Sequence, residues 1–87
     1  MTGVEIRVRY WGVIASRLNR EIESFHFQSP PDVQALLERI IEEVGPEGKE
    51  VLRHPGLLLA ANGRSVGPGH RLAGGDTVDF LSAVAGG

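Results

Sequence analysis

The 87-residue sequence contains no cysteine. The chain can therefore form no disulfide, and it offers neither a thiolate nucleophile nor a thiolate ligand for a metal ion. Any sulfur that the protein handles must come from another molecule.

Long apolar runs and concentrated positive charge are also missing. No apolar run approaches the roughly 18–20 residues that cross a bilayer, and Met1-Thr2-Gly3 leads into a charged strand pattern and not into a signal peptide. The arginines are scattered and the formal net charge is −2, whereas binding of nucleic acid needs a concentrated basic face. We therefore expect a cytoplasmic protein that binds neither nucleic acid nor a membrane.

The composition favours one small folded domain, since 41% of the residues are hydrophobic and 23% are charged. A chain this short buries only about 60–65% of its unfolded surface, which allows one core and not two. We expect the domain to span residues 1–81 and a flexible tail to span residues 82–87.

Most of the expected strands follow from apolar residues at a spacing of two. In residues 21–28, Ile22 falls on the opposite parity to Phe25 and Phe27, which suggests a bulge or an early frame shift. Residues 13–18 are short enough for one or two helical turns, and their form stays open. Asn62-Gly63 is a strong hairpin signal, because both residues tolerate positive φ. The expected strands are residues 4–10, 21–28, 57–61 (buried), 65–66 and 77–81.

One long amphipathic helix is predicted after Ser29-Pro30-Pro31-Asp32. Ser29 is suited to cap it and Pro30 to occupy its first position, while Gly45-Pro46 is expected to end it. Residues 47–56 are expected to form a polar connection, and whether it includes one turn of helix around Val51-Leu52 stays open. The helix presents one continuous apolar stripe: Val33, Leu36, Leu37, Ile40, Ile41 and Val44.

This order of elements predicts an α+β fold, with a mixed sheet of four to five strands covered on one face by one long helix. A single helix covers only one face of a sheet, so the other face stays available to partners. Leu81 has the opposite parity to Phe80 and is expected to point toward that open face.

The end of the sequence is the feature most suggestive of chemistry, because six small residues lead to Gly86-Gly87. Extended, they reach about 20 Å, and glycine lets the backbone pass through a narrow channel of a partner. A carboxylate is a poor electrophile at neutral pH. Attack on the α-phosphate of ATP would activate it as an acyl-adenylate, from which a sulfur nucleophile would displace AMP. The alternative is an ordinary frayed terminus.

Other candidate sites are weaker. The glycines near positions 67–75 match neither of the two phosphate-loop motifs, GxGxxG and GxxxxGK[ST], and are expected to form turns. The three histidines show no spacing typical of metal ligands. Asp76 and Asp79 favour solvated or turn-capping roles over acid/base catalysis. An acidic flank on the predicted helix favours a solvated face: Glu38, Glu42, Glu43, Glu47 and Glu50.

The stretch from Leu57 to Gly87 resembles the small subunit of molybdopterin synthase, the MoaD type, within the ubiquitin-like β-grasp sulfur carriers that include the ThiS type. Residues 8–12 and the helix from Pro31 extend this resemblance over nearly the whole chain. Ser82-Ala83 stand where many MoaD-type tails have two prolines, so this tail is expected to be less rigid. The matching residues are Asn62, Leu72, Gly75, Asp76, Val78, Phe80, Val84, Gly86 and Gly87.

The resemblance implies a non-catalytic carrier with a ubiquitin-like β-grasp fold. Gly87 would be adenylated by an E1-like enzyme of the MoeB/ThiF type, which uses ATP and Mg²⁺, and would then receive sulfur from a donor such as a persulfide protein. The thiocarboxylate would serve a large catalytic subunit of the MoaE type in building the molybdopterin dithiolene. No cofactor or metal would be bound by the carrier itself. The residues implied to bind the partner are Leu81, Ser82, Ala83, Val84, Ala85 and Gly86.

Three alternatives remain open at this point. Sister carriers serve thiamine, cysteine or transfer-RNA thiolation. A ubiquitin-like modifier would join the same diglycine to lysines of other proteins, although having only Lys49 argues against chains built on itself. A plain interaction module would have an inert tail.

Overall fold

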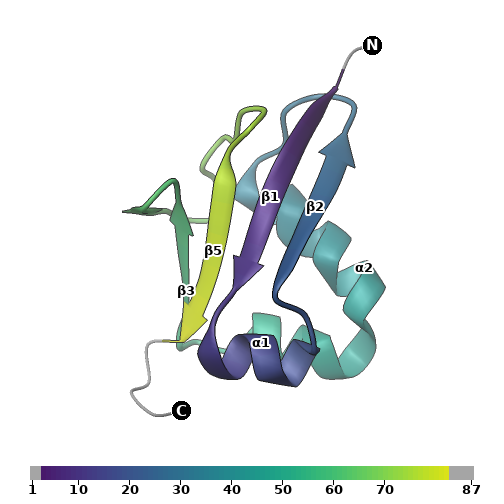
Figure 1. Cartoon of the computed structure of the whole chain (residues 1–87), viewed down its shortest axis with the longest axis vertical. Helices are drawn as coiled ribbons and strands as arrows, with labels where there is room; N and C mark the ends of the chain where they lie inside the picture. The colour runs from purple at the N-terminus through teal and green to yellow at the C-terminus, as the bar shows by residue number, and fades with distance from the viewer. Residues whose placement is uncertain (1–2, 83–87) are drawn as a thin grey trace.

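A computed structural model describes residues 3–82, which form a five-stranded mixed sheet and two helices (Figure 1). The strands lie in the order β2-β1-β5-β3-β4. β1 and β5 are parallel, and the other neighbouring strands are antiparallel. The predicted α+β class is confirmed, with all five strands present. Their bounds are β1 (Val4–Tyr10), β2 (Ile22–Phe27), β3 (Leu57–Ala61), β4 (Arg64–Ser65) and β5 (Thr77–Ser82).

The long helix α2 (Val33–Leu52) covers one face of the sheet (Figure 1). The segment whose form was left open is a second helix, α1 (Gly12–Leu18), which contacts both β5 and α2 at one end of the sheet. The other face of the sheet has no helix over it (Figure 1). One covered face and one open face are therefore present, as predicted.

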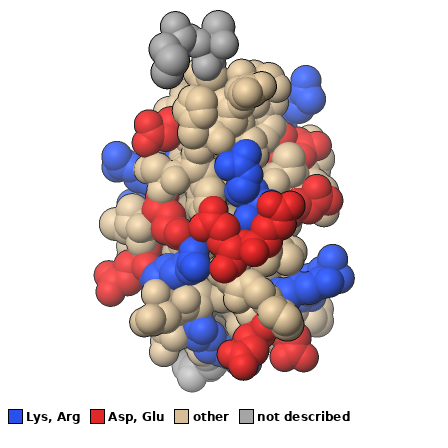
Figure 2. Space-filling model, turned by 90° about the vertical axis from the view of Figure 1, so that its right-hand side faces the viewer, with Lys and Arg blue, Asp and Glu red and all other residues tan. Residues whose placement is uncertain are grey.

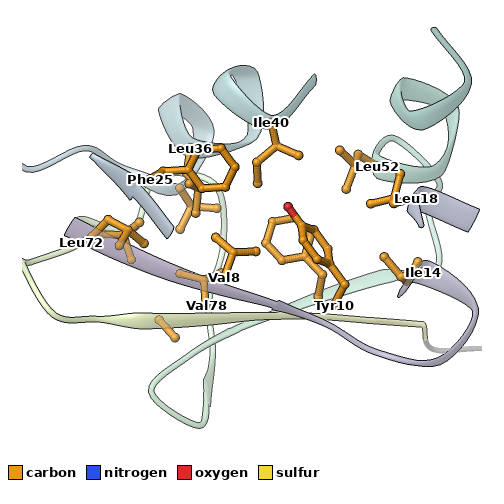
Figure 3. Close-up of a cluster of buried hydrophobic side chains, with 14 of the residues drawn as sticks. Val8, Tyr10, Ile14, Leu18, Phe25, Leu36, Ile40, Leu52, Leu72 and Val78 are labelled. Atoms are coloured by element: carbon orange, nitrogen blue, oxygen red, sulfur yellow. The ribbon is translucent and has the colours of Figure 1, made fainter. Parts of the chain in front are cut away.

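The core lies between α2 and the two central strands (Figure 3). Val8 of β1 and Phe80 of β5 are fully buried, as are Leu36 and Ile40 on the apolar stripe of α2. Burial of each such side chain contributes about 1.5–3 kcal/mol. The Tyr10 ring is also buried and lies 5.5 Å from the Phe80 ring, measured between centroids.

The N-terminus of α2 differs from the prediction. Asp32, and not Ser29, is the N-cap, and its Oδ1 accepts a hydrogen bond of 2.8 Å from the backbone N–H of Ala35. The helix starts at Val33 because its first N–H groups are taken up from outside: Val33 N–H donates to the His70 carbonyl, and Gln34 N–H to the Pro68 carbonyl. Contacts with a distant loop therefore set this boundary.

The expected end of α2 at Gly45-Pro46 is a kink. Gly45 leaves helical geometry with φ 76° and ψ −170°, a conformation that residues with a Cβ rarely adopt. Proline is well suited to begin a new helical segment, because the missing N–H is not needed there. Residues 46–52 therefore continue as helix, where a mostly polar connection was expected, and bury Val51 and Leu52 against the core.

No bulge occurs in β2, contrary to the expectation. Its pairing with β1 runs without interruption from Arg9–Ile22 to Val4–Phe27. Ile22 falls off the parity of Phe25 because its side chain points to the open face, where 65% of the residue is exposed. The predicted hairpin turn is confirmed, since Asn62 and Gly63 both have positive φ, although β4 begins at Arg64 and not at Ser65.

Candidate functional site: the open sheet face at the end of β5

The residues predicted to bind a partner begin at the end of β5. Residues 83–87, and with them Gly87 and Gly86, lie outside the described part of the chain. Leu81 and Ser82 are described, and both belong to β5, which therefore runs one residue beyond its expected end. Their register partners on β3 are Leu58 and Leu57. Pairing with Leu57 of β3 therefore fixes the position of Ser82, the last described residue.

Leu81 points toward the open face, as its parity predicted. Phe80 is fully buried under α2, and Leu81 follows it on the opposite side of the sheet with intermediate exposure. Leu58, directly across on β3, is 49% exposed, and only Ala61 of this strand is buried, so the prediction of a buried strand was wrong for most of β3. A continuous apolar run looks like a strand buried on both faces, but only one face is covered here. The two leucines form an apolar pair beside the tail.

A charged cluster lies next to this pair in the middle of the open face. Asp79 of β5 accepts from Arg9 of β1, with 2.6 Å between Oδ1 and Nε and 3.1 Å between Oδ2 and a terminal guanidinium nitrogen. The indole Nε1–H of Trp11 donates to the same Oδ1 over 2.9 Å. The Arg9 guanidinium also lies over the Trp11 ring, 5.4 Å from its centroid. We call Arg9, Trp11 and Asp79 the Asp79 cluster.

The Asp79 cluster holds a charge that the surrounding sheet nearly buries. Asp79 is only 7% exposed, so the expectation of a solvated or turn-capping aspartate was wrong for this residue. The hydrogen bonds from the Arg9 guanidinium, followed by the one from Trp11, lower the pKa of the Asp79 carboxyl below its ordinary value. Asp79 is therefore ionised at neutral pH, with its charge offset by Arg9.

Exposed apolar side chains also occur toward the β1 and β2 side of this face. Trp11 is 47% exposed and Ile22 is 65% exposed. Sequence reasoning missed both as surface features. The signal for Ile22 was its off-parity position, which was interpreted as a bulge. Ile22, Leu58 and Leu81 lie around the Asp79 cluster, to which Trp11 itself belongs. This side of the sheet therefore combines apolar contact area with fixed polar groups, as is typical of protein-binding surfaces.

Asp76, the second aspartate considered, has a turn-capping role as predicted. Its two carboxylate oxygens accept from Asn62 Nδ2 at 2.9 Å and from the backbone N–H of Ala73 at 2.8 Å. Asn62 Oδ1 in turn accepts from the N–H of Thr77 at 3.0 Å. The bond from Ala73, followed by that from Asn62, lowers the pKa of Asp76. This turn holds the start of β5 against the end of β3.

The helix side of the molecule is charged and differs from the open face. The acidic residues predicted to form a solvated flank on α2 are exposed. Acidic side chains gather across the middle of this side, with Lys and Arg between them (Figure 2). Glu43 belongs to this flank and lies 3.6 Å from Arg20. The apolar contact area and the acidic flank therefore occupy different sides of the domain.

The described residues contain no constellation that suggests metal binding or membrane insertion. Between Gly3 and Ser82, no three His, Cys, Asp or Glu side chains lie close enough together to hold a metal ion. No helix in that range is both long and apolar enough to span a bilayer.

Comparison with known proteins gives a family match over most of the chain. The model of the ThiS family matches residues 9–87. A search of curated proteins found no match to the sequence.

Solved structures show the same fold at low sequence identity. A Pyrococcus furiosus protein provisionally described as subunit 1 of molybdopterin converting factor has a TM-score of 0.75 and 21% identity, covering 93% of this chain and 99% of its own. The Haloferax volcanii small archaeal modifier protein 1 has a TM-score of 0.75 and 14% identity, covering 94% of this chain and 100% of its own. Subunit 1 of the Helicobacter pylori molybdopterin-converting factor was solved in a complex with subunit 2. It has a TM-score of 0.62 and 24% identity, covering 97% of this chain and 100% of its own.

Proposed function

The chain belongs to the ThiS family of ubiquitin-like sulfur carriers, and we propose from this that it carries sulfur as a thiocarboxylate on Gly87 for the synthesis of the molybdopterin dithiolene. The observation that supports this most directly is that the family match extends through Gly86 and Gly87. In this function the protein is a non-catalytic co-substrate, and its partners supply the active sites.

The chemistry starts with an ionised carboxylate, which must be activated before sulfur can attack. One oxygen of the Gly87 carboxylate attacks the α-phosphate of ATP and releases pyrophosphate, with ATP and Mg²⁺ held by an E1-like enzyme of the MoeB/ThiF type. The terminal sulfur of a protein persulfide then displaces AMP and forms an acyl disulfide. A thiol cleaves this disulfide, is itself oxidised to a disulfide, and releases the thiocarboxylate. We expect this exchange in the cytoplasm.

The second partner we propose is a large catalytic subunit of the MoaE type. The Helicobacter pylori structure of subunit 1 in complex with subunit 2 supports this choice. The position of Ser82 at the end of β5, next to Leu58 and Leu81, also supports it, because a partner that takes in residues 83–87 would meet this apolar pair first. Leu81 and Ser82 then contact the partner surface, and residues 83–87 enter its channel.

The test uses the intact mass of the chain after incubation with an E1-like enzyme, ATP, Mg²⁺ and a persulfide donor. We expect a mass gain equal to the difference between one sulfur and one oxygen atom. Deletion of Gly87, or addition of one alanine after it, should abolish the gain because the reacting carboxylate is displaced by one residue in the channel. Both variants should unfold at the wild-type denaturant concentration, since the core lies within residues 6–80.

Three results would contradict the proposal. Normal sulfur loading of either variant would show that Gly87 is not the reacting residue. Conjugates to lysines of other proteins without the mass gain would indicate a modifier. The absence of both products, with an active enzyme confirmed on another carrier, would leave an interaction module. If loading occurs, adding different large subunits tests the molybdopterin pathway against the thiamine, cysteine and transfer-RNA pathways.

A further inference from the structure

The sheet of residues 3–82 has two edge strands, and of these β2 is the long one. β4 has two residues, whereas β2 has six and no strand on its outer side (Figure 1). β2 pairs with β1 without a bulge and contains neither proline nor lysine, which are features that commonly protect an edge strand from pairing with another chain. The edge of β2 is therefore suited to accept a further strand.

Three residues of β2 direct their backbone groups away from the sheet. The N–H of Tyr10 donates to the Glu21 carbonyl at 2.8 Å, and hydrogen-bonded pairs alternate along an antiparallel ladder. The register of β1 with β2 therefore turns the N–H and C=O groups of Ile22, Ser24 and His26 outward. All three residues are exposed. Such a row of donors and acceptors can bind an extended chain as an added strand.

One contact from α2 occupies the far end of this row. A terminal guanidinium nitrogen of Arg39 donates to the His26 carbonyl at 3.1 Å, and the guanidinium lies 4.3 Å from the centroid of the Phe27 ring. The outward backbone groups of Ile22 and Ser24 have no hydrogen-bond partner among residues 3–82. The stretch open to a new strand therefore runs from Ile22 to the N–H of His26.

The helix side of this edge is rich in carboxylates. Glu42 and Glu43 follow Arg39 by about one helical turn, so they share its side of α2. Glu43 lies 3.6 Å from Arg20, whose guanidinium is already bonded to Glu23 of β2 at 2.7 Å. Figure 2 shows this side of the molecule, with acidic side chains across its middle and Lys and Arg between them.

The charges around the edge do not cancel. Six charged groups lie at the start of β2 and on its helix side: Glu21, Glu23, Glu42, Glu43, Arg20 and Arg39. Four carboxylates and two guanidinium groups leave an excess of two negative charges. On the open face, Glu5 and Arg7 of β1 lie opposite His26 and Ser24 and offset each other. The electrostatics of the edge therefore favour a positively charged strand.

We propose that β2 takes up an extended basic segment of a partner protein as a sixth strand. The segment bonds to the outward backbone groups of Ile22 and Ser24 and to the His26 N–H. Because side chains alternate between the two faces of a strand, every second residue faces Glu23 and Glu43 and is basic, while the residues between lie beside Ile22 and are apolar. A second copy of this chain would instead bring the same negative excess against itself, which like-charge repulsion disfavours.

This inference does not depend on sulfur transfer, and NMR of the whole chain with a peptide tests it. The probe is acetyl-Lys-Val-Lys-Val-Lys-amide, which has the proposed alternation. We expect saturable shifts of the Ile22, Ser24 and His26 amide signals. Their exchange with solvent should slow about threefold or more at saturation, because these N–H groups become hydrogen-bonded. The amides of Glu23 and Phe25 face β1 and should keep their exchange rates.

A second peptide tests the charge of the occupant. Acetyl-Glu-Val-Glu-Val-Glu-amide has the same length and the same apolar residues, and it should bind about tenfold more weakly or less, because its charges have the wrong sign. Raising the salt concentration should weaken binding of the lysine peptide, since exposed charges are screened.

Variants of the chain test the two parts of the site. Glu42→Gln with Glu43→Gln should weaken binding of the lysine peptide about threefold or more. The matched control is Glu47→Gln with Glu50→Gln, which removes two exposed carboxylates beyond the kink at Gly45 and should change affinity little. Ser24→Pro removes an outward N–H that β1 does not use, and it should abolish binding while the core signals keep their positions.

Each other outcome overturns the proposal. Unchanged Ile22 and Ser24 signals at millimolar lysine peptide mean that the edge accepts no strand. Equal affinity for the two peptides, or an equal loss in the two glutamine double variants, removes the role of the acidic side. Shifts of Leu58 and Leu81 in place of β2 assign the peptide to the open face. Shifts of Ile22 and Ser24 on concentrating the protein alone indicate pairing between copies.

Discussion

Asp79 shows how a single residue joins two strands that are distant in sequence. Its carboxylate binds Arg9, 70 positions earlier, and it is nearly buried in the open face. A carboxylate in this position stabilises the fold only while it is ionised, because the folded state holds the hydrogen-bond donors that match the charged form. The stability that this pair contributes therefore depends on pH.

We predict that Asp79→Asn lowers the free energy of unfolding at pH 7 by about 1–3 kcal/mol, since the donor groups of two side chains, Arg9 and Trp11, lose a charged acceptor. The pKa of Asp79 is lower in the folded state than the ordinary value of 3.8. Its stabilising effect is therefore complete above that value and is lost as the pH falls through the folded-state pKa. The difference between wild type and variant should shrink as the pH is lowered below 3.8.

Urea unfolding from pH 7 to pH 2 measures this difference. Asp76 also has a lowered pKa, and it contributes equally to both proteins, so only the difference reports on Asp79. A gap between the two proteins that stays constant down to pH 2 would contradict the assigned role of the charge.

Gly48 is the second residue with a specific structural requirement. It is buried in α2 after the kink, and a Cβ there would overlap the Val44 side chain and lie 3.1 Å from Leu18 Cδ2 in α1. We predict that Gly48→Ala destabilises the domain by about 1–3 kcal/mol through overpacking. Gly67→Ala is the control, because no atom lies within 4 Å of its Cβ position. Thermal unfolding of the two variants should separate them, and equal midpoints would refute the packing argument.

At the scale of elements, α2 depends on a cap that local sequence did not identify. Ser29 and Asp32 are both suitable N-cap residues, and the sequence alone favoured Ser29 because Pro30 follows it. The structure selects Asp32, since the first turn of α2 donates two backbone hydrogen bonds to the loop at Pro68 and His70. These contacts come from a segment more than 30 residues away.

We predict that Asp32→Ala lowers the free energy of unfolding by about 1 kcal/mol, the usual cost of losing an N-cap. Ser29→Ala should leave stability unchanged within about 0.5 kcal/mol, because Ser29 is exposed and outside the helix. Chemical denaturation of both variants provides the measurement. If Ser29→Ala were the more damaging change, the assignment of the cap would be wrong.

At the scale of the whole molecule, the fold separates two surfaces with different chemistry. Exposed acidic residues lie along α2 (Figure 2), while exposed apolar residues lie on the open face next to the end of β5. In the proposed function, a partner that holds the tail therefore meets Leu58 and Leu81 together. Because the Asp79 cluster fixes the centre of this face, few side chains need to become ordered when a partner binds.

We predict that Leu58→Ser weakens binding to an E1-like enzyme or a large subunit about tenfold or more, the loss expected when one buried apolar contact is removed from an interface. Stability should change little, because Leu58 is already 49% exposed. Ile22→Ser, two strands from β5 on the same face, is the matched control and should have a smaller effect. Isothermal titration calorimetry gives the affinities. Wild-type affinity of Leu58→Ser would exclude this face as the docking surface.

The sequence alone determined the elements whose signals are local. The alternation in residues 4–10, the apolar stripe of α2, the Asn62-Gly63 turn and the outward direction of Leu81 depend on neighbours a few positions apart, and each is present in the structure. The proposed chemistry of Gly87 rests on the resemblance to the sulfur carriers together with the Gly86-Gly87 pair, and it remains a prediction because the structure describes no residue beyond Ser82.

Only the tertiary structure decided which residues meet across the sheet. The pairing of Leu81 with Leu58, the ion pair of Asp79 with Arg9 and the choice of Asp32 as cap all join segments more than 20 residues apart. Such contacts depend on strand order and on which face the helix covers, and neither appears in the spacing of nearby residues. The mistaken expectations for Ile22, Leu58 and Asp79 have this same physical cause, because local pattern does not reveal which face of a strand is covered.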